Sequence, residues 1–240
     1  MSNSPRIDLG FALTWLGHSA FHLLTPGGKH VLFDPWLANP RAPKGFAVDK
    51  LDAILLSHGH GDHVGDTVAL AQKHDCAVIC GYELSLILEE QGVKTAIGMG
   101  KGGTVEAAGL RVTATHAIHS SSADVAGARV YAGEPLGFVV KLENDAAIYF
   151  AGDTGPMSDM AVIGELYEPN VSVLPIGDLY TMGPREAAWA AAKLGSAFVV
   201  PMHYGTFGAL TGTPDALRGE LQARGSAAKV IAPEPGERVE

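Results

Sequence analysis

The sequence has few cysteines, so a disulfide framework is excluded as the basis of its fold. Only 2 cysteines occur in 240 residues. Cys76 and Cys80 belong to one apolar run, and on a strand that spacing separates them by roughly 13 Å, which is too far for a disulfide. We therefore expect buried thiols in a reducing compartment.

Long apolar runs and basic clusters are also missing. No uninterrupted stretch approaches the roughly 18 apolar residues of a membrane-spanning helix, and residues 1–6 lack the apolar segment of a signal peptide. The formal net charge is −9, which disfavours duplex nucleic acid and anionic membranes as partners. We expect a cytoplasmic protein that acts on a small-molecule substrate and has no nucleic-acid or membrane partner. A homo-oligomer is compatible with the sequence.

The apolar content is sufficient for one large domain spanning residues 1–240. Hydrophobic residues make up 47% of the chain and charged residues 18%, as in ordinary globular proteins. The pattern of short apolar runs and turn signals predicts strands and then alternating strands and helices, twice over. Helices are expected at 67–73, 83–90, 158–167, 184–194 and 214–223, and strands at 11–16, 20–24, 30–33, 53–56, 77–80, 93–97, 110–115, 136–142, 146–150, 171–174, 197–200 and 229–231. Two such halves predict an α/β fold with two sheets packed face to face and helices outside.

The most informative segment is His-Gly-His-Gly-Asp-His at residues 58–63, directly after an apolar run. Three imidazoles and a carboxylate within six residues offer several donors to a divalent metal. His58 and His60 are two apart, so on an extended segment they project to the same side. Asp62 and His63 lie at the following turn, where they can reach a second ion or a substrate.

The glycines between these donors fit the same interpretation. Gly59 and Gly61 carry no Cβ, which lets the backbone fold tightly around the donors. A solvated histidine tract on the surface would not follow an aliphatic strand. The segment therefore predicts a metal site at the end of a buried strand.

Later apolar runs end in the same way, on a histidine or an aspartate. They lead into His119, with His116 three residues before it, and into Asp153 and His203. Strands that end at one sheet edge can hold several ligands in place. Because residues three apart on a strand face opposite sides, only one of His116 and His119 should point inward.

With these motifs the chain resembles the metallo-β-lactamase superfamily. More narrowly it is similar to a branch of small, largely uncharacterised metal-dependent hydrolases related to ascorbate-6-phosphate lactonase. The motifs that carry the resemblance are Gly17-His18-Ser19, Phe33-Asp34-Pro35, the segment 56–66, His119-Ser120-Ser121, Asp153 in Ala-Gly-Asp-Thr, Pro175-Ile176-Gly177-Asp178, Thr181-Met182-Gly183-Pro184 and His203-Tyr204-Gly205-Thr206-Phe207. The resemblance implies a four-layer αββα sandwich with a dinuclear centre at the sheet edge.

The resemblance also implies a ligand set and a reaction. The first metal would take His58, His60 and His119, the second Asp62, His63 and His203, and Asp153 would bridge them. Nitrogen and oxygen donors without thiolate suit two divalent ions, zinc first, with manganese, iron, nickel and cobalt as further candidates. The implied enzyme is a hydrolase in which a metal-bound hydroxide cleaves a small ester, lactone or phosphodiester.

Four further residues are assigned more weakly. His18 is expected to line the pocket as a proton donor or substrate contact, although it can also be a turn histidine. Asp34 is expected to orient a metal-binding histidine. Asp178 is expected either to orient a metal-binding histidine or to line the substrate pocket. Tyr204 can donate to an oxyanion or simply pack, so the catalytic candidates are Asp62, His18 and Tyr204.

Two alternative functions remain at this point. A non-catalytic metal-binding module would need the ligands but no open coordination position, whereas seven donors around two metals leave room for water and substrate. An RNA-processing metallonuclease also occurs on this fold, but the acidic balance of the chain disfavours it. The motif by itself does not identify the substrate.

Overall fold

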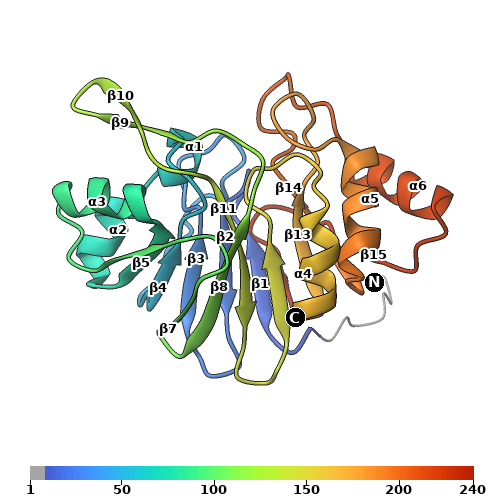
Figure 1. Cartoon of the computed structure of the whole chain (residues 1–240), viewed down its shortest axis with the longest axis horizontal. Coiled ribbons are helices and arrows are strands. Elements are labelled where there is room, and N and C mark those ends of the chain that lie inside the picture. Colours follow the sequence, from blue (N-terminus) through green and yellow to red (C-terminus); the bar gives the residue numbers. More distant parts are fainter. Residues whose placement is uncertain (1–8) are drawn as a thin grey trace.

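The computed structural model describes residues 9–240, in which two seven-stranded sheets pack face to face between two layers of helices (Figure 1). The first sheet has the order β16-β1-β2-β3-β4-β5-β6 and the second the order β15-β14-β13-β12-β11-β8-β7. This architecture confirms the expected α/β fold of four layers.

Each sheet combines antiparallel and parallel pairs. The first sheet consists of β1 (Ala12–Trp15), β2 (Phe21–Leu24), β3 (His30–Phe33), β4 (Ala53–Leu55), β5 (Ala77–Gly81), β6 (Ala96–Met99) and β16 (Arg238–Val239). The second consists of β7 (Thr104–Ala107), β8 (Leu110–His116), β11 (Leu136–Lys141), β12 (Ala147–Phe150), β13 (Val171–Pro175), β14 (Phe198–Met202) and β15 (Lys229–Val230). A hairpin of β9 (Ser122–Val125) and β10 (Ala128–Tyr131) stands apart from both sheets.

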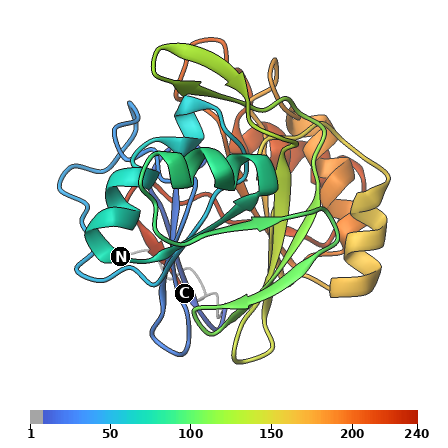
Figure 2. The ribbon, with the colours of Figure 1, turned by 60° about the vertical axis from the view of Figure 1, so that its left-hand side comes forward.

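Helices cover the outer faces. The first sheet is flanked by α2 (Thr67–His74) and α3 (Tyr82–Glu90), and the second by α4 (Asp159–Tyr167), α5 (Pro184–Leu194) and α6 (Pro214–Ala223). The short helix α1 (Gly61–Val64) lies near the hairpin at one edge of the sandwich, as Figures 1 and 2 both show. Among residues 9–240 no helix has the length and apolarity to cross a membrane.

The main core lies between the two sheets. Phe33 on β3 stacks on Phe150 on β12 with ring centroids 4.7 Å apart, and Phe21 on β2 meets the same ring edge-on. The central strands are buried on both faces because helices cover the side turned away from this core. Both halves of the chain contribute to this core, which supports the prediction of one domain; residues 1–8 of that range lie outside the described part.

Most elements lie close to the expected ranges, with differences that have local causes. The strand β6 begins at Ala96 rather than at Val93. The amide of Val93 instead donates to the carbonyl of Leu88 in the turn that ends α3. The histidine segment is not a continuous extended strand: β4 ends at Leu55, a loop follows, and His60 is the N-cap of α1. The strands β7, β9, β10 and β16 were not expected, because their short, partly exposed segments lack an apolar run.

Candidate metal centre

The residues predicted to bind metal come together at one edge of the sandwich. They follow the ends of strands from both sheets, where parallel strands expose their carboxyl ends. Three residues at this edge have left-handed backbones, His18 (φ 52°), Asp34 (φ 40°) and His203 (φ 55°). Such conformations are costly for residues other than glycine and are concentrated at functional sites.

The first donor group contains His58, His60 and His119, whose ligand atoms lie within 4.8 Å of one another. His58 Nε2 lies 2.9 Å from His60 Nδ1. The ring of His119 stands edge-on to both, at centroid distances of 5.1 and 5.2 Å. This group has the composition that the resemblance implied for the first metal.

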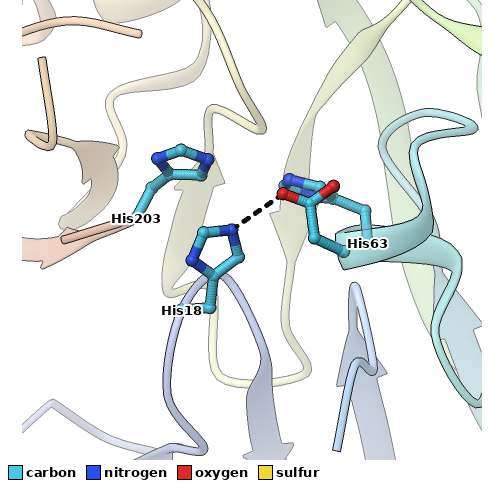
Figure 3. A group of neighbouring side chains, drawn as sticks. His18, His63 and His203 are labelled. Carbon is cyan, nitrogen blue, oxygen red and sulfur yellow. Dashed lines mark hydrogen bonds and ion pairs between the residues drawn. The ribbon is translucent and has the colours of Figure 1, made fainter. Parts of the chain in front are cut away.

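The second donor group contains His18, Asp62, His63 and His203, again with ligand atoms within 4.8 Å of one another. Figure 3 shows the three imidazoles facing a common space, with the dashed line marking the 3.1 Å contact between His18 Nε2 and Asp62 Oδ2. His18 is fully buried, and the Asp62 side chain is 31% exposed. Three members were expected as ligands of the second metal, and His18 joins them.

Asp153 lies between the two groups. Its Oδ2 is 3.0 Å from His203 Nε2 and 3.3 Å from His63 Nε2 in the second group, and 3.7 Å from His119 Nε2 in the first. The carboxylate is almost completely buried. One oxygen within reach of both groups is the arrangement that a bridging ligand needs.

Asp34 and Ser57 orient two of the histidines. Asp34 Oδ2 accepts from His63 Nδ1 at 2.7 Å and from Ser57 Oγ at 2.6 Å, and Asp34 Oδ1 accepts from the Ser57 amide. Because the Ser57 hydroxyl donates to Asp34, it accepts from His58 Nδ1, 2.9 Å away. Both rings are therefore protonated at Nδ1 and turn Nε2 toward the donor groups, as ligating histidines commonly do.

Burial and the mutual approach of these groups shift their pKa values strongly. Burial and the neighbouring His63 hold the pKa of His58 well below its usual value. For His63, burial is outweighed by the charges of Asp153 and Asp34, which raise its pKa well above the usual value. For Asp153, burial is outweighed by His203 and His63, which hold its pKa well below the usual range.

Unpartnered buried atoms test whether the residues fit a metal. Asp153 Oδ1 is buried without a hydrogen-bond partner, and His63 Nε2 is buried with only the 3.3 Å ion-pair contact to Asp153 Oδ2 described for it. A buried polar atom without a partner is costly, and a cation that accepts nitrogen and oxygen donors removes that cost. The donor chemistry and these atoms therefore fit divalent metal ions at this edge.

The structure separates the two histidines that competed for the first group. His119 belongs to the group, whereas His116 ends β8 and its Nδ1 accepts from Lys101 Nζ at 2.8 Å. Lys101 also pairs with Glu134 at 3.0 Å. His116 is therefore part of a surface ion-pair network rather than a donor group.

Tyr204 and Asp178 are not brought to the donor groups. The Tyr204 ring stacks on Trp15 at 4.9 Å, with the Arg41 guanidinium 5.5 Å from its centroid. Burial raises the pKa of Tyr204 to about 12. Asp178 is exposed, and its Oδ1 accepts from the amide of Leu179 in a turn. The geometry gives both residues structural contacts, and no observation supports an oxyanion contact for Tyr204.

Apolar side chains line the rim beside the second group. Trp36 and Phe207 stack at 5.9 Å, and their rings lie 5.3 and 5.5 Å from the ring of His18. Phe207 remains 41% exposed, and Ile118, next to His119, is 49% exposed. Exposed apolar groups beside convergent polar atoms are typical of small-molecule sites.

Sequence reasoning did not single out Ser57, Thr206 or Thr154 at this edge. Thr206 Oγ1 lies 3.0 Å from His18 Nδ1, and Thr154 Oγ1 accepts from the amide of Ile118. Hydroxyl residues are common throughout the chain, so their identity alone carried no signal. The available clue was that each lies in a motif of the resemblance, beside or near a predicted ligand.

Comparison with known proteins identifies the family of the chain. A model of the beta-lactamase superfamily domain matches residues 29–204. A UPF0173 metal-dependent hydrolase of Koribacter versatilis is 47% identical over 210 residues, which cover 87% of this chain and 90% of that protein. One of Rubrobacter xylanophilus is 44% identical over 233 residues, 96% of each chain.

Solved structures give the same result. Igni18, a metallo hydrolase from Ignicoccus hospitalis, superposes with a TM-score of 0.84 at 34% identity, over 95% of this chain and 97% of that one. An isothiocyanate hydrolase from Delia radicum gut bacteria has a TM-score of 0.71 at 22% identity, over 95% and 98% of the two chains, and shares the fold. The chain therefore belongs to the metallo-β-lactamase superfamily and is a metal-dependent hydrolase.

Proposed function

We propose that this hydrolase has a dinuclear centre and cleaves a small ester, lactone or phosphodiester. The observation that carries the proposal is the position of Asp153, whose Oδ2 lies within 3.7 Å of nitrogens from both donor groups. A single-ion site would need only one of the two groups. Two groups that share a buried carboxylate support two ions held close together.

The residues that would hold the ions follow from the two groups. His58, His60 and His119 would hold the first, Asp62, His63 and His203 the second, and Asp153 would join both. When bound, two divalent ions lower the pKa of bound water toward neutrality and polarise the electrophilic oxygen of the scissile bond. Zinc is the first candidate, and manganese, iron, nickel and cobalt suit the same donors.

The chain's own residues prepare the site for that chemistry. Ser57 and Asp34 hold the His58 and His63 rings with Nε2 inward, so these ligands need no rearrangement. Asp62 is the most accessible carboxylate of the centre and stands opposite His18. Both belong to the second donor group, and we retain them as catalytic candidates, while Tyr204 is left out.

The rim supports a small-molecule substrate. Trp36 and Phe207 offer a stacked apolar wall directly beside His18. Two of the basic side chains are engaged in ion pairs: Lys101 with Glu134 at 3.0 Å, and Arg129 with Asp124 at 3.5 Å. No observation at this edge favours RNA as the substrate, and a purely metal-binding module does not agree with membership among metal-dependent hydrolases.

The cellular location and oligomeric state stay predictions. Cys76 and Cys80 are both free and buried, which agrees with a reducing compartment such as the cytoplasm. No described contact bears on a homo-oligomer.

Elemental analysis of protein isolated without chelator tests the dinuclear proposal. We expect about two divalent ions per chain in the wild type and fewer in Asp153→Ala, because the shared carboxylate is lost. His116→Ala is the matched control, since this residue is near the centre but outside both groups, and its metal content should equal that of the wild type. Wild-type protein that holds at most one ion after reconstitution would contradict the proposal.

The reaction class needs a separate assay. Metal-replete protein is screened against esters, lactones, phosphodiesters, thioesters and β-lactams. Turnover of an ester, lactone or phosphodiester that falls in Asp153→Ala, but not in His116→Ala, supports the proposed bond classes. Turnover confined to another bond class would exclude them without affecting the metal assignment.

A further inference from the structure

We propose that His18 is a metal ligand of the second donor group, which makes that site richer in protein donors than the first. This inference rests on the proposed dinuclear centre and adds a residue to it. His18 follows β1 in the turn before β2, far in sequence from the histidine segment at 58–63. Its role is therefore decided by geometry and not by the motif.

The backbone holds His18 rigidly at this place. The residue is fully buried and has a φ of 52°. Its carbonyl accepts from Trp15 Nε1 at 2.9 Å and from the amide of His203 at 3.0 Å. These two hydrogen bonds fix the backbone of His18, and its ring is fully buried beside the centre.

The distances from the ring are those of a ligand. His18 Nε2 lies 3.1 Å from Asp62 Oδ2, and the ring centroid lies 4.1 Å from that of His203. Two donors that bind one ion at about 2.1 Å and at right angles are about 3 Å apart. His18 and Asp62 therefore have the separation of neighbouring ligands of a single ion.

The hydrogen bond on the other side of the ring selects the nitrogen that binds. His18 Nδ1 lies 3.0 Å from Thr206 Oγ1, and the Thr206 hydroxyl donates to the carbonyl of Tyr204 at 3.4 Å. In the tautomer in which this oxygen accepts Nδ1–H, the neutral ring carries its lone pair on Nε2. That lone pair faces the oxygen of Asp62, and two acceptors at this distance repel each other unless a cation lies between them.

The two sites then differ in their protein donors. The first has three histidines and a share of Asp153. The second has three histidines, Asp62 and a share of Asp153, which is more than the four ligands of a tetrahedral site. We expect the second site to prefer ions that accept five or six ligands, such as manganese, iron, cobalt or nickel. The first site keeps more open positions for substrate.

Cobalt(II) is the probe for this inference, because its visible spectrum reports on coordination number. Wild type, His18→Ala, Thr206→Val and the control His116→Ala are stripped of metal and titrated with Co²⁺, with stoichiometry measured by elemental analysis. His18→Ala should bind the second Co²⁺ at least ~10-fold more weakly, and its spectrum should change toward lower coordination. Thr206→Val, which only releases the ring orientation, should weaken binding of the same ion by about 10-fold, and His116→Ala should match the wild type.

The outcomes separate this inference from the proposed function. Wild-type protein that binds only one Co²⁺ removes the dinuclear centre and the inference with it. Two Co²⁺ bound to His18→Ala with the affinity and spectrum of the wild type would overturn the role of His18 and leave the dinuclear centre intact. If His18→Ala does not fold, Thr206→Val decides, and unchanged binding of the second ion in that variant would overturn the inference.

Discussion

A relay of three hydrogen bonds decides which nitrogen of His58 and of His63 can bind a metal. It runs from His58 Nδ1 through the Ser57 hydroxyl to Asp34, and from Asp34 to His63 Nδ1. All four side chains are buried. Because Asp34 is an acceptor only, both rings must carry their proton on Nδ1, and both present the lone pair of Nε2.

The variant Asp34→Asn should disturb this relay without changing its shape. The amide oxygen can still accept from the Ser57 amide, while its NH₂ group replaces the oxygen that faces His63 Nδ1. His63 Nδ1 then accepts a hydrogen bond from this amide, so the proton of the ring moves to His63 Nε2. A proton on Nε2 prevents that nitrogen from binding a metal. We expect metal affinity at the second group to fall by about 10- to 100-fold, measured by titration with a chelating competitor.

The matched control for this change is Asp52→Asn. Asp52 also accepts from a backbone amide, that of His30 at 2.9 Å, but it lies outside both donor groups. The metal affinity of the Asp52→Asn protein should stay at the wild-type value. Equal loss in the two variants would mean that the charge of the whole chain, and not the relay, governs binding.

At the scale of elements, the β9–β10 hairpin packs on the loop that carries His58 and His60. The amide of Gly59 donates to Ser121 Oγ at 3.1 Å, and Ser121 Oγ donates to the carbonyl of Ala132 at 3.2 Å. Figure 2 shows the hairpin above α1 at this edge of the sandwich. The hairpin therefore helps to position the first donor group although it belongs to neither sheet.

Gly59 and Gly61 are predicted to respond differently to alanine. A Cβ at Gly59 would lie 2.6 Å from Ala132 Cβ and 3.1 Å from the Ser122 carbonyl carbon, whereas a Cβ at Gly61 meets nothing within 4 Å. Gly59→Ala should therefore destabilise the fold by about 1–3 kcal/mol and weaken metal binding at the first group. Gly61→Ala, at the start of α1, should be neutral in both urea unfolding and metal titration.

This pair of variants also refines the sequence interpretation of the two glycines. Both were expected to permit tight folding around the donors, but only Gly59 is in close contact with another element. Loss of stability in Gly61→Ala equal to that in Gly59→Ala would show that the chain conformation, and not the hairpin contact, requires the glycines.

At the scale of the whole molecule, a half-buried histidine pair couples stability to pH. His22 on β2 stacks on His30 on β3, with Nε2 and Nδ1 3.1 Å apart. Burial, the neighbouring His30 and Arg238 on β16 lower the pKa of His22 to about 4. This residue therefore stays neutral in the folded chain at pH values where it is protonated in the unfolded chain.

The sign of the effect follows from proton uptake. Between the ordinary pKa of 6.5 and the folded value of about 4, the unfolded state holds the extra proton, so the free energy of unfolding falls as the pH is lowered through this window. The contribution lost is about 2–3 kcal/mol. His22→Gln should lose less stability than the wild type between pH 7 and pH 5 in urea titrations.

The other histidines are the same in both proteins, so the difference between the two pH profiles isolates His22. His74→Gln on α2 is the control, because His74 lies outside this pair and outside both donor groups. It should keep the wild-type dependence on pH. A His22→Gln variant that follows the wild-type curve would contradict the coupling.

The sequence by itself determined the elements whose signals are local. The helix α5 spans Pro184–Leu194 as expected, because proline suits the first helical position and Gly195 ends the helix with a φ of 69°. The same holds for α6, which begins at Pro214 after Thr213 caps its first turn. The donors at the ends of apolar strands were also readable, because several apolar runs in one chain end on a histidine or an aspartate.

The tertiary structure decided which residues stay outside these donor groups and which join them. The resemblance assigned His119, and the pairing of β8 with β11 together with Lys101 keeps His116 outside both groups. His18 enters the second group because the turn after β1 is bonded to the amide of His203, on the other sheet. Contacts between segments far apart in sequence depend on packing and register, which local propensity does not encode.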